Sequence, residues 1–245
     1  MMFFNCVQTF RERSHFLFVC FVRIGYFDRN KVLAYNLSPL VRKQDHGEQV
    51  CSQLSQSGHS PEFSICDITS TENVKQLAQE IKSKHGGLDI LINNSGILDP
   101  PSLIAKGKMT YSEQVARAVN TNFFGTLNVC NAIFPLLRPN ARVVNVSSRL
   151  GVASILEADK RHRLLDMCLT ENELLKLMKD FIESAANGTL ISNGWPEQRE
   201  NSWNSTAYSV SKLALTLLSQ LQARVLASDE RCVTVNAVSY KVGRL

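Results

Sequence analysis

The chain alternates between short apolar runs and segments in which apolar residues recur every three or four positions. Short apolar runs that end in turn residues are typical of buried parallel strands, whereas the three-to-four spacing is typical of amphipathic helices. A regular exchange of the two predicts an α/β fold, a Rossmann-like doubly wound parallel sheet with right-handed crossovers. The pattern predicts helices within residues 42–58, 70–87 and 110–137, and strands within residues 30–36, 61–69, 88–96 and 141–148.

Residues 151–204 interrupt this alternation. Within them, Thr170 and Glu173 have the spacing of a capping box, which predicts a helix over about 171–186. We therefore interpret the segment as an inserted helix followed by a loop. Apolar residues line one face of the expected helix at helical spacing: Leu174, Leu177, Met178, Phe181 and Ile182.

Beyond the insert, the pattern predicts a long amphipathic helix over 206–227 and a strand over 232–238. We find no internal repeat and no linker, so residues 1–245 are expected to form a single domain. Its atypical N-terminal segment, residues 1–29, contains the apolar run Phe16–Val22. Since a membrane-spanning helix needs roughly 20 apolar residues and no clear signal cleavage site follows, we expect a buried strand there and no membrane segment.

Composition and charge narrow the class of protein. The chain has 245 residues, 44% of them hydrophobic and 20% charged, which is typical of a soluble globular domain. Its net charge is +5 with basic residues scattered along the chain, so nucleic acid is not the expected partner. Seven cysteines without a CxxC motif indicate free thiols in a reducing compartment, and the five histidines lack the spacing of metal ligands.

Polar residues gather where ligands bind in such folds, at the carboxyl ends of the strands. They comprise Asp67, the stretch 93–96, and the pair Ser147 and Ser148. In the helix expected over 206–227, Tyr208 and Lys212 are four residues apart and so share a face. A neighbouring cation favours phenolate over phenol, which suits a tyrosine for proton donation to a carbonyl oxygen.

These motifs resemble the short-chain dehydrogenase/reductase family, and in particular its monomeric NADPH-dependent carbonyl reductases. The supporting stretches are "CDIT", "GGLDILINNSGI", "NTNFFGTLNVCNAIFPLL", "RVVNVSS", "NGWP" and "AYSVSK". The resemblance implies a cytoplasmic, monomeric oxidoreductase that uses NADPH to reduce aldehydes or ketones to alcohols. It also implies that the insert covers a face that other members use for oligomerisation.

The resemblance further implies a catalytic set. Tyr208 resembles the acid–base tyrosine, and Lys212 resembles the lysine that lowers the pKa of this tyrosine and contacts the nicotinamide ribose. Ser148 resembles the substrate-orienting serine, with Ser147 as the alternative if the turn shifts by one residue. Asn122 resembles the asparagine that holds a water in the proton relay.

Cofactor and substrate contacts are implied in the same way. Asp67 resembles the acid near the adenine, Asn94 resembles a residue of the cofactor wall, and Ser95 stands where alanine is more usual. Gln114 matches a substrate-side position. The full expected cofactor set is Asp67, Ile68, Asn94, Ser95, Gly96, Tyr208 and Lys212.

The chain departs from the family at both ends. A glycine loop of the form TGxxxGxG is expected within about the first 30 residues, but this segment contains only Gly25. Since such glycines let backbone N–H groups approach the pyrophosphate, residues 1–29 are not expected to form that cradle. The family's basic residue for the 2′-phosphate has no clean counterpart after "LAYN", and Arg42 and Lys43 are candidates only if the register shifts. At the other end, "SYKVGRL" replaces the expected Pro-Gly turn after "VNAV". We therefore expect a sheet that is incomplete at both ends.

These departures leave a second hypothesis from another class of protein. The chain could be a catalytically impaired relative that acts, if at all, as a binding or regulatory protein. Protection of the purified chain by NADPH would discriminate between the two hypotheses.

Overall fold

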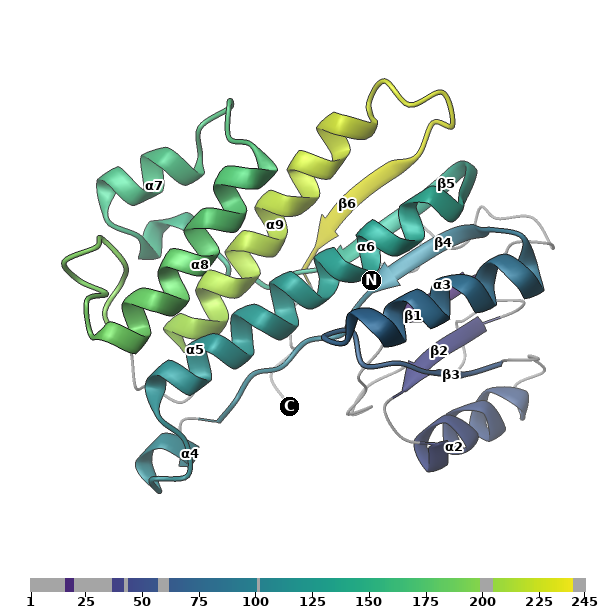
Figure 1. Ribbon diagram of the computed structural model, residues 1–245, viewed down its shortest axis with the longest axis horizontal. Helices are drawn as coiled ribbons and strands as arrows, with labels where there is room; N and C mark the ends of the chain where they lie inside the picture. Colours follow the sequence, from purple (N-terminus) through teal and green to yellow (C-terminus); the bar gives the residue numbers. More distant parts are fainter. Residues whose placement is uncertain are drawn as a thin grey trace. The chain divides into compact units, whose positions relative to one another are not determined.

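A computed structural model describes the chain at residues 16–19, 37–41, 44–56, 62–100, 102–198 and 205–239 (Figure 1). The expected strand over 30–36 and the candidates Arg42 and Lys43 lie outside these residues. Of the atypical segment 1–29, only residues 16–19 are described, so the predicted absence of a phosphate cradle there stays a prediction.

The strands form a sheet of the Rossmann type. β1 runs parallel to both β2 and β4, and Phe16 lies opposite Leu37 on one side and Ile90 on the other. The strand order is β3-β2-β1-β4-β5-β6, the order found in dinucleotide-binding folds, and it confirms the α/β prediction. The strands are β1 (Phe16–Val19), β2 (Leu37–Val41), β3 (Ser64–Ile65), β4 (Leu88–Asn93), β5 (Leu137–Val146) and β6 (Thr234–Val238).

The chain forms two compact units. Unit 1 comprises Met1–Ser95, Asn128–Val144 and Leu226–Thr234. Unit 2 comprises Gly96–Leu127, Asn145–Val225 and Val235–Leu245. The expectation that residues 1–245 form a single domain stays a prediction.

Unit 1 combines strands with two helices, α2 (Gln44–Ser55) and α3 (Thr71–His85). Helix α2 contacts β2 and β3. Helix α3 begins after Ser70, whose hydroxyl accepts a hydrogen bond from the backbone of the third helical residue, and it ends at Gly86 in the left-handed conformation. The apolar face of α3 and most of β4 are buried, as the alternating pattern predicts.

Strand β5 starts earlier than expected. It begins at Leu137, before the apolar run expected to start at residue 141, and ends at Val146. The polar residues at its start are held by distant segments: Arg138 forms an ion pair with Asp89, and the N–H of Asn140 donates to the carbonyl of Arg231 at 2.6 Å. Such partners leave no trace in the local pattern.

In place of the single helix expected over 110–137, the chain forms three consecutive segments. α5 (Tyr111–Val119) leads into a π-helical turn (Asn120–Gly125), and α6 (Thr126–Ile133) follows. The π-turn interrupts the regular backbone hydrogen bonding, and such turns occur often at functional sites. The expectation of one uninterrupted helix was therefore wrong at Asn120–Gly125.

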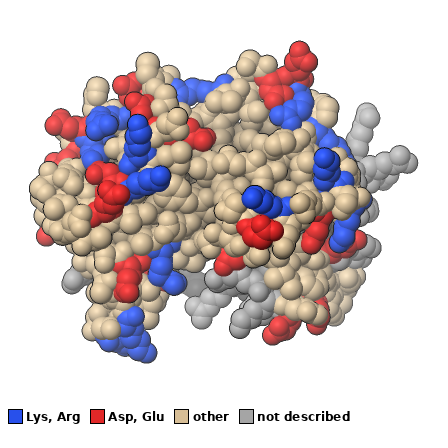
Figure 2. All heavy atoms as spheres, in the orientation of Figure 1, with Lys and Arg blue, Asp and Glu red and all other residues tan. Residues whose placement is uncertain are grey.

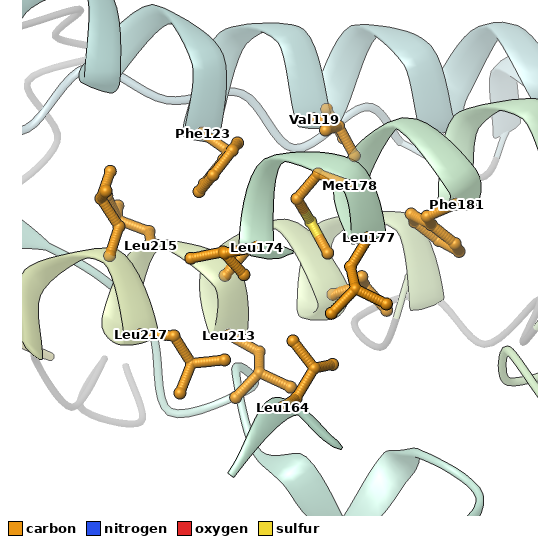
Figure 3. Packing of buried hydrophobic residues seen from close by; sticks show 14 of the residues in the cluster. Val119, Phe123, Leu164, Leu174, Leu177, Met178, Phe181, Leu213, Leu215 and Leu217 are labelled. Carbon is orange, nitrogen blue, oxygen red and sulfur yellow. The ribbon is translucent and has the colours of Figure 1, made fainter. Parts of the chain in front are cut away.

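The inserted helix of unit 2 confirms the local prediction. α8 (Glu171–Asn187) begins with the capping box of Thr170 and Glu173 and ends at Gly188, which has φ +69°. Its apolar face is buried against α5 (Tyr111–Val119) and α9 (Thr206–Leu226), and Figure 3 shows these side chains together. The buried residues of the α8 face are Leu174, Leu177, Met178 and Phe181.

A polar cluster holds the end of the insert. The indole N–H of Trp195 donates to Asp180 at 2.8 Å, and Lys160 of α7 (Ala158–Leu164) pairs with the same carboxylate at 3.0 Å. Lys160 also lies over the indole ring, and Phe181 contacts this ring from α8. The "NGWP" stretch is thus anchored to two helices of unit 2.

Charged side chains are spread over the surface of the described residues. On the face drawn in Figure 2, basic and acidic side chains of the described residues are interspersed, without a large area of one sign. In the part of the chain that the structure describes, none of the helices is both long and apolar enough to cross a bilayer. The short helical segments not yet mentioned are α4 (Ser102–Ala105) and the 3₁₀ turns Phe134–Leu136 and Ala153–Ile155.

Candidate active site

Helix α9 carries the tyrosine and lysine predicted to act together. Ser205 precedes the helix, and its hydroxyl accepts a hydrogen bond from the N–H of Tyr208 at 3.4 Å. The Nζ atom of Lys212 lies 5.8 Å from the centre of the Tyr208 ring. The side chain of Tyr208 is half-buried, whereas Lys212 is only 3% exposed. The two residues therefore share a face of α9, as their spacing predicts.

Burial controls the charge of Lys212. Desolvation lowers the pKa of its ammonium group to about 8, because burial disfavours the charged form. The same group donates a hydrogen bond of 2.7 Å to the carbonyl of Val146, the last residue of β5. At neutral pH Lys212 is mostly protonated, so a cation lies beside the Tyr208 ring.

The structure separates the two serines at the end of β5. The hydroxyl of Ser147 is buried, donates to the carbonyl of Lys212 at 2.8 Å and contacts the hydroxyl of Thr216 at 2.7 Å. Ser148 is half-buried, and its hydroxyl accepts a hydrogen bond from the N–H of Leu150 at 3.2 Å. The Ser147 hydroxyl thus serves the contact between β5 and α9, while the Ser148 hydroxyl retains its donor for another partner.

The turn after Ser148 lies against α9. The N–H of Gly151 donates to the carbonyl of Ser148 at 3.0 Å. A Cβ atom at position 151 would lie 2.7 Å from the backbone N of Leu213 and equally close to the carbonyl carbon of Lys212. Only glycine fits so near this backbone, and the close approach brings the serine turn to the part of α9 that carries Lys212.

Asn122 lies in the π-turn, and its side chain is fully buried. Its Oδ1 accepts from the N–H of Ile97 at 2.7 Å, while its Nδ2 donates to the carbonyl of Ile97 at 3.0 Å and to the hydroxyl of Ser211 at 2.9 Å. A Cβ atom on Gly96 would lie 3.1 Å from this Oδ1 and 3.2 Å from Nζ of Lys212. Unit 2 thus brings Gly96, Asn122 and Lys212 together.

The remaining predicted cofactor residues belong to unit 1. Asp67 follows β3, and its carboxylate accepts from the N–H and the hydroxyl of Thr69 at 2.9 and 2.7 Å. Ile68 is buried, and its carbonyl accepts from Asn128 at 3.0 Å. Two further candidates directly follow β4, the half-buried Asn94 and the buried Ser95. Their assignment to the cofactor stays a prediction.

Gln114, the predicted substrate-side residue, is on α5 and is 4% exposed. Its side-chain amide donates to the carbonyl of Asp99 at 3.1 Å, and the carboxylate of Asp99 pairs with Arg117. These contacts fix the loop before α5. A direct contact of Gln114 with substrate stays a prediction.

Sequence reasoning missed three groups of this region: the hydroxyl of Ser211, the carbonyl of Val146 and the tight approach at Gly151. Each contact joins segments far apart in the chain, for example residues 122 and 211. No local signal separates Ser211 from Ser209, because both serines lie in the same apolar helical stretch and both are buried.

Comparisons with known proteins agree with this fold. The family described as "short chain dehydrogenase" matches residues 31–158. Carbonyl reductase [NADPH] 1 of Bos taurus is 35% identical over 190 residues, which are 77% of this chain and 64% of that protein. The human protein of the same name is 33% identical over 196 residues, 78% of this chain and 65% of its own length. The chain thus spans less than two thirds of the length of these relatives.

Solved structures show the same architecture. Salutaridine reductase from Papaver somniferum superposes with a TM-score of 0.70 at 23% identity, over 83% of this chain and 76% of that one. Menthone neomenthol reductase from Mentha piperita gives a TM-score of 0.67 at 24% identity, over 83% of this chain and 80% of that one. The strand order and the helices between the strands place the chain in the Rossmann-type class of α/β folds. The chain belongs to the short-chain dehydrogenase family.

Proposed function

We propose that this chain reduces aldehydes or ketones to alcohols with NADPH, as a monomer in the cytoplasm. The observation that carries the proposal is a set of hydrogen bonds in unit 2 that converge on α9. Lys212 of this helix donates to the end of β5, and Asn122 donates to Ser211 of the same helix. The matched relatives are named as NADPH carbonyl reductases, which supports the reaction class.

The proposed proton donor is Tyr208, whose hydroxyl would protonate the carbonyl oxygen of the substrate. Ser148 would donate a hydrogen bond to the same oxygen, because its proton is not used within the serine turn. Lys212 would supply a positive charge beside the Tyr208 ring. Together these residues would stabilise the negative charge that develops on the oxygen during reduction.

The residues of unit 2 fit the nicotinamide end of the cofactor. An ammonium group has three N–H donors, and one of those on Lys212 is given to Val146, so two are left for ribose hydroxyls. Gly96 leaves open the space that a Cβ atom would fill beside Lys212. NADPH, when bound, supplies the hydride. Asp67, Ile68, Asn94 and Ser95 are proposed as cofactor contacts on the resemblance to the family alone.

Burial of the insert supports the proposed monomer. The apolar face of α8 is covered by α5 and α9 of the same chain, and Phe181 at its centre is fully buried. This face is therefore not available to a second copy without disrupting the core.

The first test is catalysis by the purified chain with NADPH and a series of aromatic aldehydes and ketones. We expect Tyr208→Phe to lower kcat by about 10²–10⁴-fold, the usual contribution of a general acid, while the Kd for NADPH changes little. Tyr111→Phe is the matched control, since this tyrosine is on α5 and has no role in the proposed reaction.

Turnover that survives Tyr208→Phe would refute the proposed role of this residue. NADPH binding without turnover in the wild-type chain would instead favour the catalytically impaired relative.

A further inference from the structure

Ser211 has no role in the proposed reaction, yet its hydroxyl joins two parts of the site. It is completely buried on α9, between Tyr208 and Lys212 in the chain. The oxygen accepts a hydrogen bond from Nδ2 of Asn122 at 2.9 Å. The proton is donated to the carbonyl of Tyr208 at 2.7 Å. One hydroxyl therefore connects the π-turn to the turn of α9 that carries the tyrosine.

The other contacts of Asn122 do not reach α9. Its Oδ1 and one N–H form a pair of hydrogen bonds with the backbone of Ile97, at 2.7 and 3.0 Å. Its second N–H is the one given to Ser211. The hydrogen bond to Ser211 is thus the contact that joins the Asn122 amide to α9.

The backbone around Asn122 makes this contact more important. Residues 120–125 form a π-turn, so the regular α-helical ladder does not hold the backbone there. Without the serine hydroxyl, a buried N–H would lose its partner, and such a loss favours rotation of the amide toward another acceptor. The Oδ1 atom of Asn122 and the Nζ atom of Lys212 both lie beside Gly96. A rotation of the Asn122 amide would therefore change the space around the lysine.

We propose that Ser211 is a positioning residue, which fixes the Asn122 amide relative to the segment of α9 that carries Tyr208 and Lys212. The kinetic consequence of this inference rests on the proposed function, whereas its structural consequence does not. The residue touches neither substrate nor cofactor in this proposal. It acts through the orientation of Asn122.

The kinetic test compares Ser211→Ala with Ser209→Ala. Ser209 is also buried on α9, and its hydroxyl forms no hydrogen bond within the described part of the chain. We expect Ser211→Ala to lower kcat about tenfold, since small misplacements of catalytic groups are costly, with KM for the carbonyl compound changed less than about twofold. Ser209→Ala should leave both constants near the wild-type values, and Ser211→Thr, which keeps the hydroxyl, should recover most of the loss in kcat.

A second measurement does not depend on catalysis. The N–H of Ile97 donates to Asn122, so its hydrogen exchange reports the orientation of the amide. We expect faster exchange at Ile97 in Ser211→Ala but not in Ser209→Ala. If Ser211→Ala is too unstable to purify, Ser211→Cys is used, because a thiol has similar size but forms weaker hydrogen bonds.

Wild-type exchange at Ile97 in the Ser211 variant would overturn the inference, whatever the activity. Equal effects of the Ser209 and Ser211 variants would also overturn it, because they would point to helix packing. A wild-type chain without turnover would refute the proposed function, and the exchange measurement would still decide the role of Ser211.

Discussion

The two long helices of unit 2, α8 and α9, are stabilised in different ways. α8 is amphipathic: one apolar stripe is buried, and the remaining positions are mostly exposed. α9 is buried on nearly every side, and its buried residues include polar ones such as Ser211, Lys212 and Ser219. α8 is held mainly by its apolar stripe, with Asp180 as a polar contact to Trp195 and Lys160. α9 has several buried hydrogen bonds, which are directional and favour one orientation of the helix.

Strand β5 supplies the partners for the polar residues of α9. Asn145 donates to Ser219 at 2.9 Å and to Gln222 at 3.3 Å, and Ser147 donates to the carbonyl of Lys212 at 2.8 Å. Asn145 lies in β5 and Ser147 directly follows its last residue, and the side chains of both contact α9. These hydrogen bonds fix the position of α9 along β5. They therefore also fix the position of Tyr208 relative to Ser148. Packing of apolar side chains alone would permit small shifts.

The largest expected effect on stability is at the apolar helix. Phe181→Ala should lower the free energy of unfolding by about 3–5 kcal/mol, because a fully buried aromatic ring that contacts Trp195 leaves a cavity. Urea unfolding measures the change. Lys179→Ala, at an exposed position of α8, is the control and should change stability by less than about 0.5 kcal/mol. A loss below about 1 kcal/mol for Phe181→Ala would show that α8 is not part of the core.

The next effect is on the pH dependence of stability through Lys212. Its pKa is about 8 in the folded chain and 10.5 for an unperturbed lysine, so between these values the unfolded state binds more protons. The free energy of unfolding should therefore gain about 3 kcal/mol as the pH rises from 8 to 10.5, at roughly 1.36 kcal/mol for each unit of pKa shift. Lys212→Met should lack this gain. Equal pH dependence of the two chains would show that Lys212 is not buried as described.

The smallest effect is expected at a helix terminus. Thr170→Ala should destabilise the chain by about 1 kcal/mol, since its hydroxyl caps the N–H of Glu173. The hydrogen bonds from Thr170 lower the pKa of Glu173, so this pKa should return toward its ordinary value in the variant, as measured by NMR titration. Thr110→Ala at the matching capping box of α5 should have a similar effect. A Glu173 pKa that does not respond would contradict the capping geometry.

Substitutions in α8 and in α9 are expected to have different consequences. Loss of apolar contacts or of a cap on α8 should reduce stability without moving the pKa of Lys212. Changes to the polar partners of α9 should alter this pKa or the exchange at Ile97 even where the loss of stability is small.

Features that depend on neighbours along the chain could be predicted from the amino-acid sequence. The α/β alternation, the capping box at Thr170, the buried stripe of α8 and the shared face of Tyr208 and Lys212 all follow from spacings of two to four residues. Local hydrogen bonds and the periods of helix and strand are enough to specify them. The roles proposed for Tyr208 and Lys212 come from the resemblance to the family and stay a prediction.

Features that join distant segments could not be predicted in this way and are seen only in the folded chain. These are the π-turn at 120–125, the different partners of the Ser147 and Ser148 hydroxyls, the carbonyl partner of Lys212 and the contact between Asn122 and Ser211. Ser147 and Ser148 are adjacent serines, and the sequence around them does not tell their hydroxyls apart. Their hydrogen-bond partners differ because the Ser147 hydroxyl contacts α9, which begins nearly 60 residues later. A buried hydrogen bond of this kind depends on which surfaces meet when the chain folds, and no local periodicity records that.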